Sequence, residues 1–251
     1  MPKSQKKIQA LLLLVSLSTI EIFSQAGNPP RWEIGAGLSA FTYQGDLTPS
    51  RLGSFRTTKP GISLYLARIT SPSLAWRTQL AIGGLKGDDA KYDNPEYRKQ
   101  RAFNFRTPVI ELSQQVVWNP LRRNHKDKGI SPYLFGGAGF SFLRIRRDWS
   151  AYNAAYFDEV SDVSARLAED ASHSLPKIIP VIPLGLGVRY GISSRLAVSA
   201  EAAYRLVFTD YLDGFSQAAN PKLNDHYHTI SVGAIYRIGK NNSLDCPPVR
   251  Y

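Results

Sequence analysis

Alternation between apolar and polar residues, repeated over many short segments, is the feature that most constrains the fold of this chain. Between residues 196 and 209, every even position from Leu196 to Phe208 is apolar, whereas Glu201 and Arg205 on odd positions carry opposite charges. Successive side chains of a β-strand point to opposite faces. We therefore predict a strand with one apolar and one charged face, which suits a membrane barrel better than a soluble sandwich.

About eight segments alternate in this way over roughly nine to sixteen residues, a length that suits tilted strands crossing a bilayer. We predict strands at residues 32–44, 61–70, 73–85, 103–118, 133–145, 179–190, 196–209 and 227–238. Three connections are short or intermediate, at 71–72, 119–132 and 193–194. Four are long, at 45–60, 86–102, 146–178 and 210–226, and the third is expected to hold a short helix near residues 160–170. The pattern predicts an all-β fold, an eight-stranded antiparallel transmembrane β-barrel with short periplasmic turns and long extracellular loops.

The N-terminal residues 1–26 are predicted to be a secretory signal peptide. Three lysines precede a mainly apolar stretch from Ile8 to Ile20, and Ser24-Gln25-Ala26 offers a small-x-small cleavage site. The apolar stretch is shorter than the roughly twenty residues that a spanning helix needs, and an ordinary buried helix is the alternative. We expect the barrel over residues 27–238 and a periplasmic tail at 239–251, with both termini on the periplasmic side of a Gram-negative outer membrane.

Aromatic residues near the strand ends are expected to form two rings at the membrane interfaces. One group falls at the ends assigned to the periplasm: Trp32, Trp76, Trp118, Tyr133, Tyr190 and Tyr236. The other falls near the opposite ends: Phe41, Tyr43, Phe103, Phe105 and Phe208. The alternative is that these side chains fill the core of a periplasmic sandwich.

The polar strand faces would supply the lumen of the barrel with charges of both signs. The inward set is Glu33, Arg77, Glu111, Arg189, Glu201, Arg205 and Arg237. A barrel of about eight strands has an interior that side chains can fill, and isolated buried charges would be very unfavourable. We therefore expect these residues to pair and to seal the barrel, so that it conducts ions poorly.

Candidate catalytic residues are few. Asp210, Asp213, Asp225, His226 and His228 lie near the outer ends of the last two predicted strands, where a base and an orienting acid could be assembled. No serine lies in a recognisable nucleophile motif, and the spacing matches no defined metal-binding loop. We predict no catalytic site, no cofactor and no metal.

The net charge of the chain is positive, +11 in full and about +9 without residues 1–26. An exported chain is not expected to meet nucleic acid, so anionic lipid and lipopolysaccharide are the expected partners. Arginine binds phosphate through a planar fork of donors, and we assign lipopolysaccharide contact to Arg144, Arg146 and Arg147. The cations of one long loop would join them: Lys86, Lys91, Arg98, Lys99 and Arg101. A merely solvated basic rim is the alternative.

The periplasmic end offers a second group of contacts. Cys246 is the single cysteine of the chain, and it is either an inert exposed thiol or a partner for another periplasmic protein. The intermediate turn is also basic, and we assign contact with periplasmic partners to Arg122, Arg123, Lys126, Lys128 and Cys246.

Several stretches together resemble the PorG-like outer-membrane barrels of Bacteroidetes, whose best-known member belongs to the type IX secretion system. The stretches are Glu33-Ile34-Gly35, Tyr43-Gln44-Gly45-Asp46-Leu47, Tyr204-Arg205, Phe208-Thr209-Asp210-Tyr211-Leu212-Asp213 and Cys246-Pro247. The resemblance covers nearly the whole mature chain. It implies an eight-stranded barrel and, for the secretion member, contact with a periplasmic ring of a lipoprotein and its partner subunit.

We therefore expect a non-enzymatic outer-membrane barrel that anchors or assists a type IX-like protein secretion assembly through its periplasmic turns and tail. The alternative is a surface-exposed barrel that contacts lipopolysaccharide, a ligand or a host through its long loops.

Overall fold

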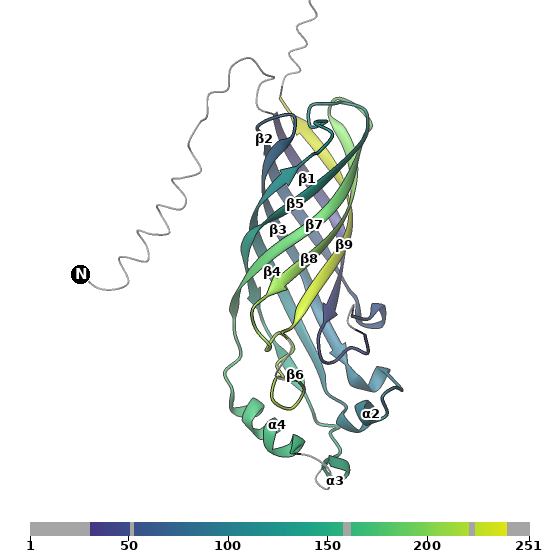
Figure 1. The fold of residues 1–251 in the computed structure, drawn as a ribbon, viewed down its shortest axis with the longest axis vertical. Helices are drawn as coiled ribbons and strands as arrows, with labels where there is room; N and C mark the ends of the chain where they lie inside the picture. The colour runs from purple at the N-terminus through teal and green to yellow at the C-terminus, as the bar shows by residue number, and fades with distance from the viewer. Residues whose placement is uncertain (1–30, 51–52, 158–161, 221–223, 240–251) are drawn as a thin grey trace, which may run out of the picture.

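Eight long antiparallel strands close into a barrel, which confirms the predicted fold class (Figure 1). The computed structural model describes residues 31–50, 53–157, 162–220 and 224–239. The predicted signal peptide, Cys246 and all but the first residue of the predicted tail lie outside the described residues.

The strands follow the order β3-β2-β1-β9-β8-β7-β5-β4, and pairing between β3 and β4 closes the ring. The barrel strands are β1 (Arg31–Gln44), β2 (Lys59–Ile69), β3 (Leu74–Asp88), β4 (Asn104–Trp118), β5 (Gly129–Leu143), β7 (Ile178–Gly191), β8 (Leu196–Val207) and β9 (His226–Ile238). A short extra strand, β6 (Arg146–Asp148), pairs with the N-terminal end of β4. Most boundaries agree with the prediction, but β5 begins at Gly129 rather than Tyr133, and β6 was not predicted.

The two ends of the barrel differ. The turn end carries the connections at 70–73, 119–128 and 192–195, and β1 begins and β9 ends there. The loop end carries the four long connections, whose described residues we call the loop-end cap: 45–58, 89–103, 144–177 and 208–225. The cap contains η2 (Phe55–Thr57), η3 (Asp89–Lys91), α2 (Tyr97–Arg101), α3 (Ala154–Phe157) and α4 (Val163–Ser172). Figure 1 shows α2, α3 and α4 below the barrel. Within the described residues, the helices are too short or too polar to cross a membrane.

The barrel is apolar outside and charged inside. Leu38 and Trp76 on the outer surface are 69% and 52% exposed, whereas Glu33 and Glu111 in the lumen are fully buried. The strands have this distribution because their apolar residues occupy every second position, as the alternation predicted. A continuous apolar outer surface of this kind is unfavourable in water and is typical of barrels surrounded by lipid.

The aromatic residues correct part of the prediction. At the turn end, Trp32, Trp76, Trp118, Tyr190 and Tyr236 are exposed on the outer surface. Tyr133 is instead buried in the lumen, because it occupies an odd, inward position of β5.

At the loop end, the predicted outer ring is wrong except at Phe208, which is 62% exposed. Phe41, Tyr43, Phe103 and Phe105 occupy inward positions and are almost fully buried. They pack with cap residues into the main hydrophobic core, whose other members include Leu47, Leu85, Leu167, Leu212 and Phe215. The core thus fills the loop end of the barrel.

Candidate functional site

All seven charged residues assigned to the lumen lie inside the barrel, in three ion-paired groups. The group nearest the turn end is centred on Glu33 of β1, whose Oε1 accepts hydrogen bonds from Arg189 Nη1 (2.9 Å) and Arg237 Nε (3.3 Å). Arg237 also donates to the carbonyl oxygens of Asp127 and Ser193 in two turns. The first group therefore closes the turn end.

The second group spans the middle of the lumen. Arg77 Nη1 of β3 donates to Glu201 Oε1 of β8 (2.5 Å), a strand on the opposite side of the ring. The same guanidinium donates twice to Gln115 Oε1, over 2.9 and 2.6 Å. Glu201 Oε1 also accepts a hydrogen bond from the Tyr133 hydroxyl (2.6 Å).

The third group lies nearer the loop end. Glu111 Oε2 accepts hydrogen bonds from Arg205 Nε (3.1 Å) and from the Tyr227 hydroxyl (2.8 Å). Arg205 Nη1 donates further to Thr229 Oγ1. A buried ion pair is tolerated when such hydrogen bonds satisfy its remaining donors and acceptors.

Aromatic rings occupy the space between these groups. The guanidinium carbon of Arg77 lies 4.3 Å from the centroid of the Phe135 ring and 5.2 Å from that of Tyr65, within the range of cation–π attraction. Gly35 leaves room for this arrangement, because a side chain there would overlap the ring of Tyr65. A cavity beside Glu201 measures about 10 Å³, room for about one water molecule. The interior is therefore filled with side chains.

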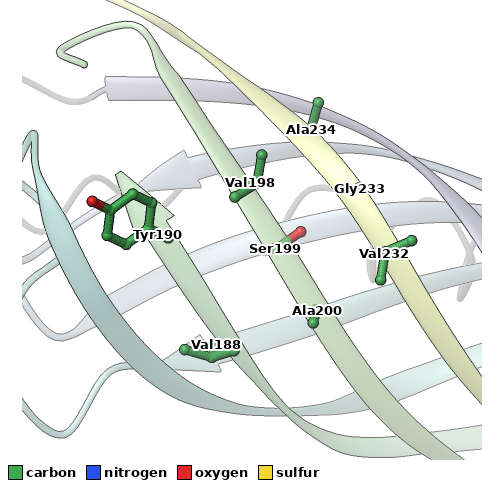
Figure 2. A pocket seen from close by; sticks show the side chains of 8 residues that line it. All are labelled: Val188, Tyr190, Val198, Ser199, Ala200, Val232, Gly233 and Ala234. Carbon is green, nitrogen blue, oxygen red and sulfur yellow. The ribbon is translucent and has the colours of Figure 1, made fainter. Parts of the chain in front are cut away.

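A much larger hollow, of about 520 Å³, lies on the outer surface of the barrel. Figure 2 shows it over β7, β8 and β9, where the small side chains of Ala200 and Ala234 lie beside Val188 and Val198. Ser199 and Tyr190 are the only polar residues of its lining. The hollow is apolar, like the rest of the outer surface, and no charged residue lines it.

Inside the loop end, three side chains form a buried polar cluster. The Tyr43 hydroxyl lies 2.7 Å from Asp213 Oδ2 and 2.6 Å from Asp225 Oδ1. Tyr43 and Asp213 belong to two of the stretches on which the PorG-like resemblance rests, so those two stretches are in direct contact.

The cluster must hold an additional proton. The Tyr43 hydroxyl has one hydrogen and can donate to one carboxylate only, so the second short contact requires a protonated carboxyl group. Burial raises the pKa of Asp213, and burial together with the neighbouring charge of Asp213 raises the pKa of Asp225. Two further aspartates of the cap shift in the same direction, since burial raises the pKa of Asp46 to about 6 and that of Asp210 to about 7.

The histidines considered as catalytic bases do not join this cluster. Asp225 and Tyr227 face the interior and are buried, whereas His226 and His228 occupy the alternate, outward positions of β9. His226 Nδ1 accepts a hydrogen bond from the Val207 amide (3.3 Å). The acid and the base that could have formed a catalytic pair therefore point to opposite faces. Within the described residues, no group of three or more His, Cys, Asp or Glu side chains is placed to hold a metal ion.

Asp170 connects two loops of the cap. It lies in α4 and is fully buried, and its carboxylate accepts hydrogen bonds from the amides of Ser216, Gln217 and Ala218. The Tyr211 hydroxyl also donates to Asp170 (3.3 Å). A single carboxylate thus ties α4 to the segment 211–218.

Two of the loop cations expected near lipid headgroups are buried instead. Arg98 Nη1 and Arg101 Nε donate to the buried carboxylate of Asp89, over 2.8 and 2.6 Å. Lys99, between them, is exposed and pairs with Asp93 (2.6 Å). The expectation of headgroup contact was therefore wrong for Arg98 and Arg101, because α2 turns both toward Asp89.

The three arginines assigned to lipopolysaccharide do not behave alike. Arg144 and Arg146 are exposed on the outer surface at the loop end. Arg147 is partly buried, and its guanidinium donates to the carbonyl oxygens of Gly214 (2.7 Å) and Ala171 (3.1 Å). Arg147 therefore holds the cap together rather than facing outward.

At the turn end, the assigned cations remain largely accessible. Arg122, Lys126 and Lys128 are exposed, whereas Arg123 is partly buried and donates to the Ile130 carbonyl (2.9 Å). Arg122 has a positive φ of 54°. The connection 119–128 thus presents three cations at one end of the barrel.

Comparison with solved structures finds similar barrels at low sequence identity. Ail, the attachment invasion locus protein of Yersinia pestis, solved with the heparin analogue sucrose octasulfate, is 12% identical, with a TM-score of 0.45 over 83% of this chain and 99% of that one. Neisserial surface protein A is 14% identical, with a TM-score of 0.42 over 82% and 96%. OprG from Pseudomonas aeruginosa is 10% identical, with a TM-score of 0.42 over 86% and 99%. Comparison with curated protein sequences gave no significant match.

The model of a family described as "Domain of unknown function (DUF6089)" matches residues 6–240. The chain belongs to the DUF6089 family. That description assigns no chemistry, so the function of this DUF6089 barrel rests on its own residues.

Several contacts of the DUF6089 barrel could not be inferred from its sequence. The partners in the contact of Tyr43 with Asp213 are 170 residues apart, and no local spacing rule joins them. Asp89 lies nine and twelve residues before Arg98 and Arg101, which is neither a strand period nor a single helix face. The one available hint was that the distinctive stretches containing Tyr43 and Asp213 both lie where a strand, β1 or β8, ends at the loop end of the barrel.

Proposed function

We propose that this protein is a non-enzymatic integral barrel of the outer membrane that anchors a type IX-like protein secretion assembly from the periplasmic side. The observation that carries the proposal is the lumen filled by ion-paired groups. A barrel whose interior is occupied by Glu33, Glu111, Glu201 and their arginine partners has no room to pass an exported chain. It would act through its surfaces instead.

The position in the membrane is supported by the two unlike ends. Outer-membrane barrels have short periplasmic turns and longer extracellular loops. The turn end would then face the periplasm, together with both termini, and the loop-end cap would face the outside. The exposed apolar band between the ends would lie in the bilayer.

Contact with periplasmic subunits is supported by the accessible cations of the turn end. Arg122, Lys126 and Lys128 project from one connection, and the C-terminal tail with Cys246 begins at the same end of the barrel. The PorG-like resemblance makes a ring of a lipoprotein and its partner subunit the expected contact. Charges at the rim of an interface mainly steer association and select partners.

The test uses two variants with equal changes of charge, made in cells that secrete through this system. One variant carries Arg122→Glu, Lys126→Glu and Lys128→Glu at the turn end. Its matched control carries Lys99→Glu, Arg166→Glu and Lys177→Glu, which replace exposed cations of the cap. We expect the turn-end variant to lose crosslinks to the periplasmic ring subunits and to lower secreted protein in the medium at least severalfold. The control should retain both.

An unchanged level of secretion in the turn-end variant would contradict the proposal. A defect in the cap variant alone would favour the second candidate, a surface-exposed barrel that binds a ligand or a host through its loops. The observation that favours this candidate is the ordered cap, which shares a hydrophobic core with the loop ends of the strands and contains buried hydrogen bonds such as that from the Ser216 amide to Asp170.

A further inference from the structure

Three cations lie side by side on the outer surface of the barrel at its loop end. Lys86 of β3, Arg106 of β4 and Arg146 of β6 occupy directly paired positions of neighbouring strands. Arg144 lies on the same outward face, two positions before Arg146. We call these four residues the cationic row. Directly opposed side chains have Cβ atoms about 5 Å apart, and like charges at this separation repel each other. The row is therefore unfavourable unless an anion lies over it.

The protein supplies few counter-charges of its own. Asp88 pairs with Lys86 (3.0 Å). Asp148, the other nearby acid, accepts hydrogen bonds from the Ser150 amide (2.9 Å) and from Asn104 Nδ2 (3.3 Å). Within the described part of the chain, Arg106, Arg144 and Arg146 are exposed and form no ion pair. Their guanidinium groups are thus available to an external ligand.

The cationic row lies at the depth of lipid headgroups. The apolar band next to it ends at Ile82, Ile110 and Phe142, which occupy paired outward positions of β3, β4 and β5. Two to four residues separate this band from the row, which is roughly 7 to 13 Å along a strand. Because membrane strands are tilted, this distance corresponds to the headgroup layer outside the hydrocarbon core.

The row is confined to one side of the barrel. At the same end, the outward positions of β1 and β9 carry Thr42, Gln44, His226 and His228 rather than arginine or lysine. Arg147 does not belong to the row, since its guanidinium is bonded to Gly214 and Ala171. The cations therefore form a local patch rather than an evenly charged rim.

We propose that the cationic row binds the phosphate groups of a diphosphorylated glycolipid of the outer leaflet, the chemical class of lipid A. Neighbouring strands are about 4.8 Å apart, so the row spans roughly 10 Å. That width exceeds one phosphate group and suits a headgroup with two. Each arginine can donate two parallel hydrogen bonds to phosphate. The inference rests on the proposed insertion of the barrel with its loop end outward.

The test measures lipid retained by the full mature chain in phosphatidylcholine nanodiscs containing lipid A, with native mass spectrometry as the readout. The row variant carries Arg106→Gln, Arg144→Gln and Arg146→Gln. The matched control carries Lys99→Gln, Arg166→Gln and Arg195→Gln, an equal loss of charge at exposed positions outside the row. We expect the row variant to need at least about tenfold more lipid A for equal retention, because several charge-assisted hydrogen bonds are lost. The control should match the unmodified protein, and dephosphorylated lipid A should bind weakly to all three.

Equal retention of lipid A by the row variant and the unmodified protein would overturn the inference. Equal retention of phosphatidylglycerol and lipid A by the unmodified protein would also overturn it, since the row would then bind any anionic lipid. Failure of the unmodified protein to insert into nanodiscs would refute the membrane proposal and this inference together. Insertion without a preference for lipid A would refute this inference alone.

Discussion

At the residue scale, the sequence predicted which charged side chains enter the lumen but not which of them pair. The face of each side chain follows from the two-residue period alone. Glu33 and Arg237 are direct cross-strand neighbours, which register could have suggested. The pair of Glu111 with Arg205 connects β4 with β8, which are not adjacent, so its geometry depends on closure of the whole ring.

Substitution of Glu111 by Ala should be strongly destabilising. It leaves Arg205, which is 2% exposed, without its carboxylate partner. Removing one partner of a buried ion pair costs about 3–5 kcal/mol, because the other charge remains buried. Urea unfolding of the protein in lipid vesicles should show this loss in the free energy of unfolding. The matched control is Glu169→Ala, which replaces an exposed side chain of α4 and for which we expect a change within about 0.5 kcal/mol. Equal effects of the two substitutions would contradict the pairing in the lumen.

At the scale of elements, the strands could be predicted and the cap could not. The alternation located eight strands because burial of one face repeats with a fixed period. The cap depends on contacts between distant loops, such as Arg101 with Asp89 and α4 with the segment 211–218. The aromatic residues at the loop end were predicted to form a ring at the membrane surface. Most of them, such as Phe41, instead point into the core, because the cap covers this end of the barrel and packs against them.

The stability of the cap should fall as the pH rises. The pKa of Asp46 is raised to about 6 and that of Asp210 to about 7, both above the usual value near 3.9 for an unfolded chain. The folded cap therefore favours their protonated forms, and this stabilisation is complete below about pH 4 and lost as the pH rises through about 6 to 7. Hydrogen exchange, corrected for its intrinsic pH dependence, should show weaker protection of residues 208–218 at pH 8 than at pH 5.

The control for this prediction is Asp210→Asn, which keeps the shape of the side chain and cannot ionise. The difference in protection between pH 5 and pH 8 should become smaller in this variant, while exchange in the barrel strands stays the same. Protection of residues 208–218 that is equal or greater at pH 8 in the unmodified protein would contradict the assignment of buried protonated aspartates to the cap.

At the scale of the whole molecule, the outer surface, the lumen and the two ends of the barrel have separate roles. The apolar outer surface determines where the barrel can reside, and the three charged groups of the lumen fill its interior. Accessible charges remain at the turn end, around Lys126, and at the loop end, in the cationic row. Partner binding should therefore occur at these two surfaces rather than through the barrel.

The central claim, that the lumen is filled, is tested most directly by single-channel recording in planar lipid bilayers. Vesicles carrying the full mature chain are fused with the bilayer, after insertion has been verified by protection of the barrel strands from protease. We predict no stable conductance steps above the background of protein-free vesicles, because Arg77 and Glu201 bridge opposite walls at 2.5 Å. Long-lived conductance steps of large amplitude, reproduced in independent insertions, would show an open pore and contradict the account.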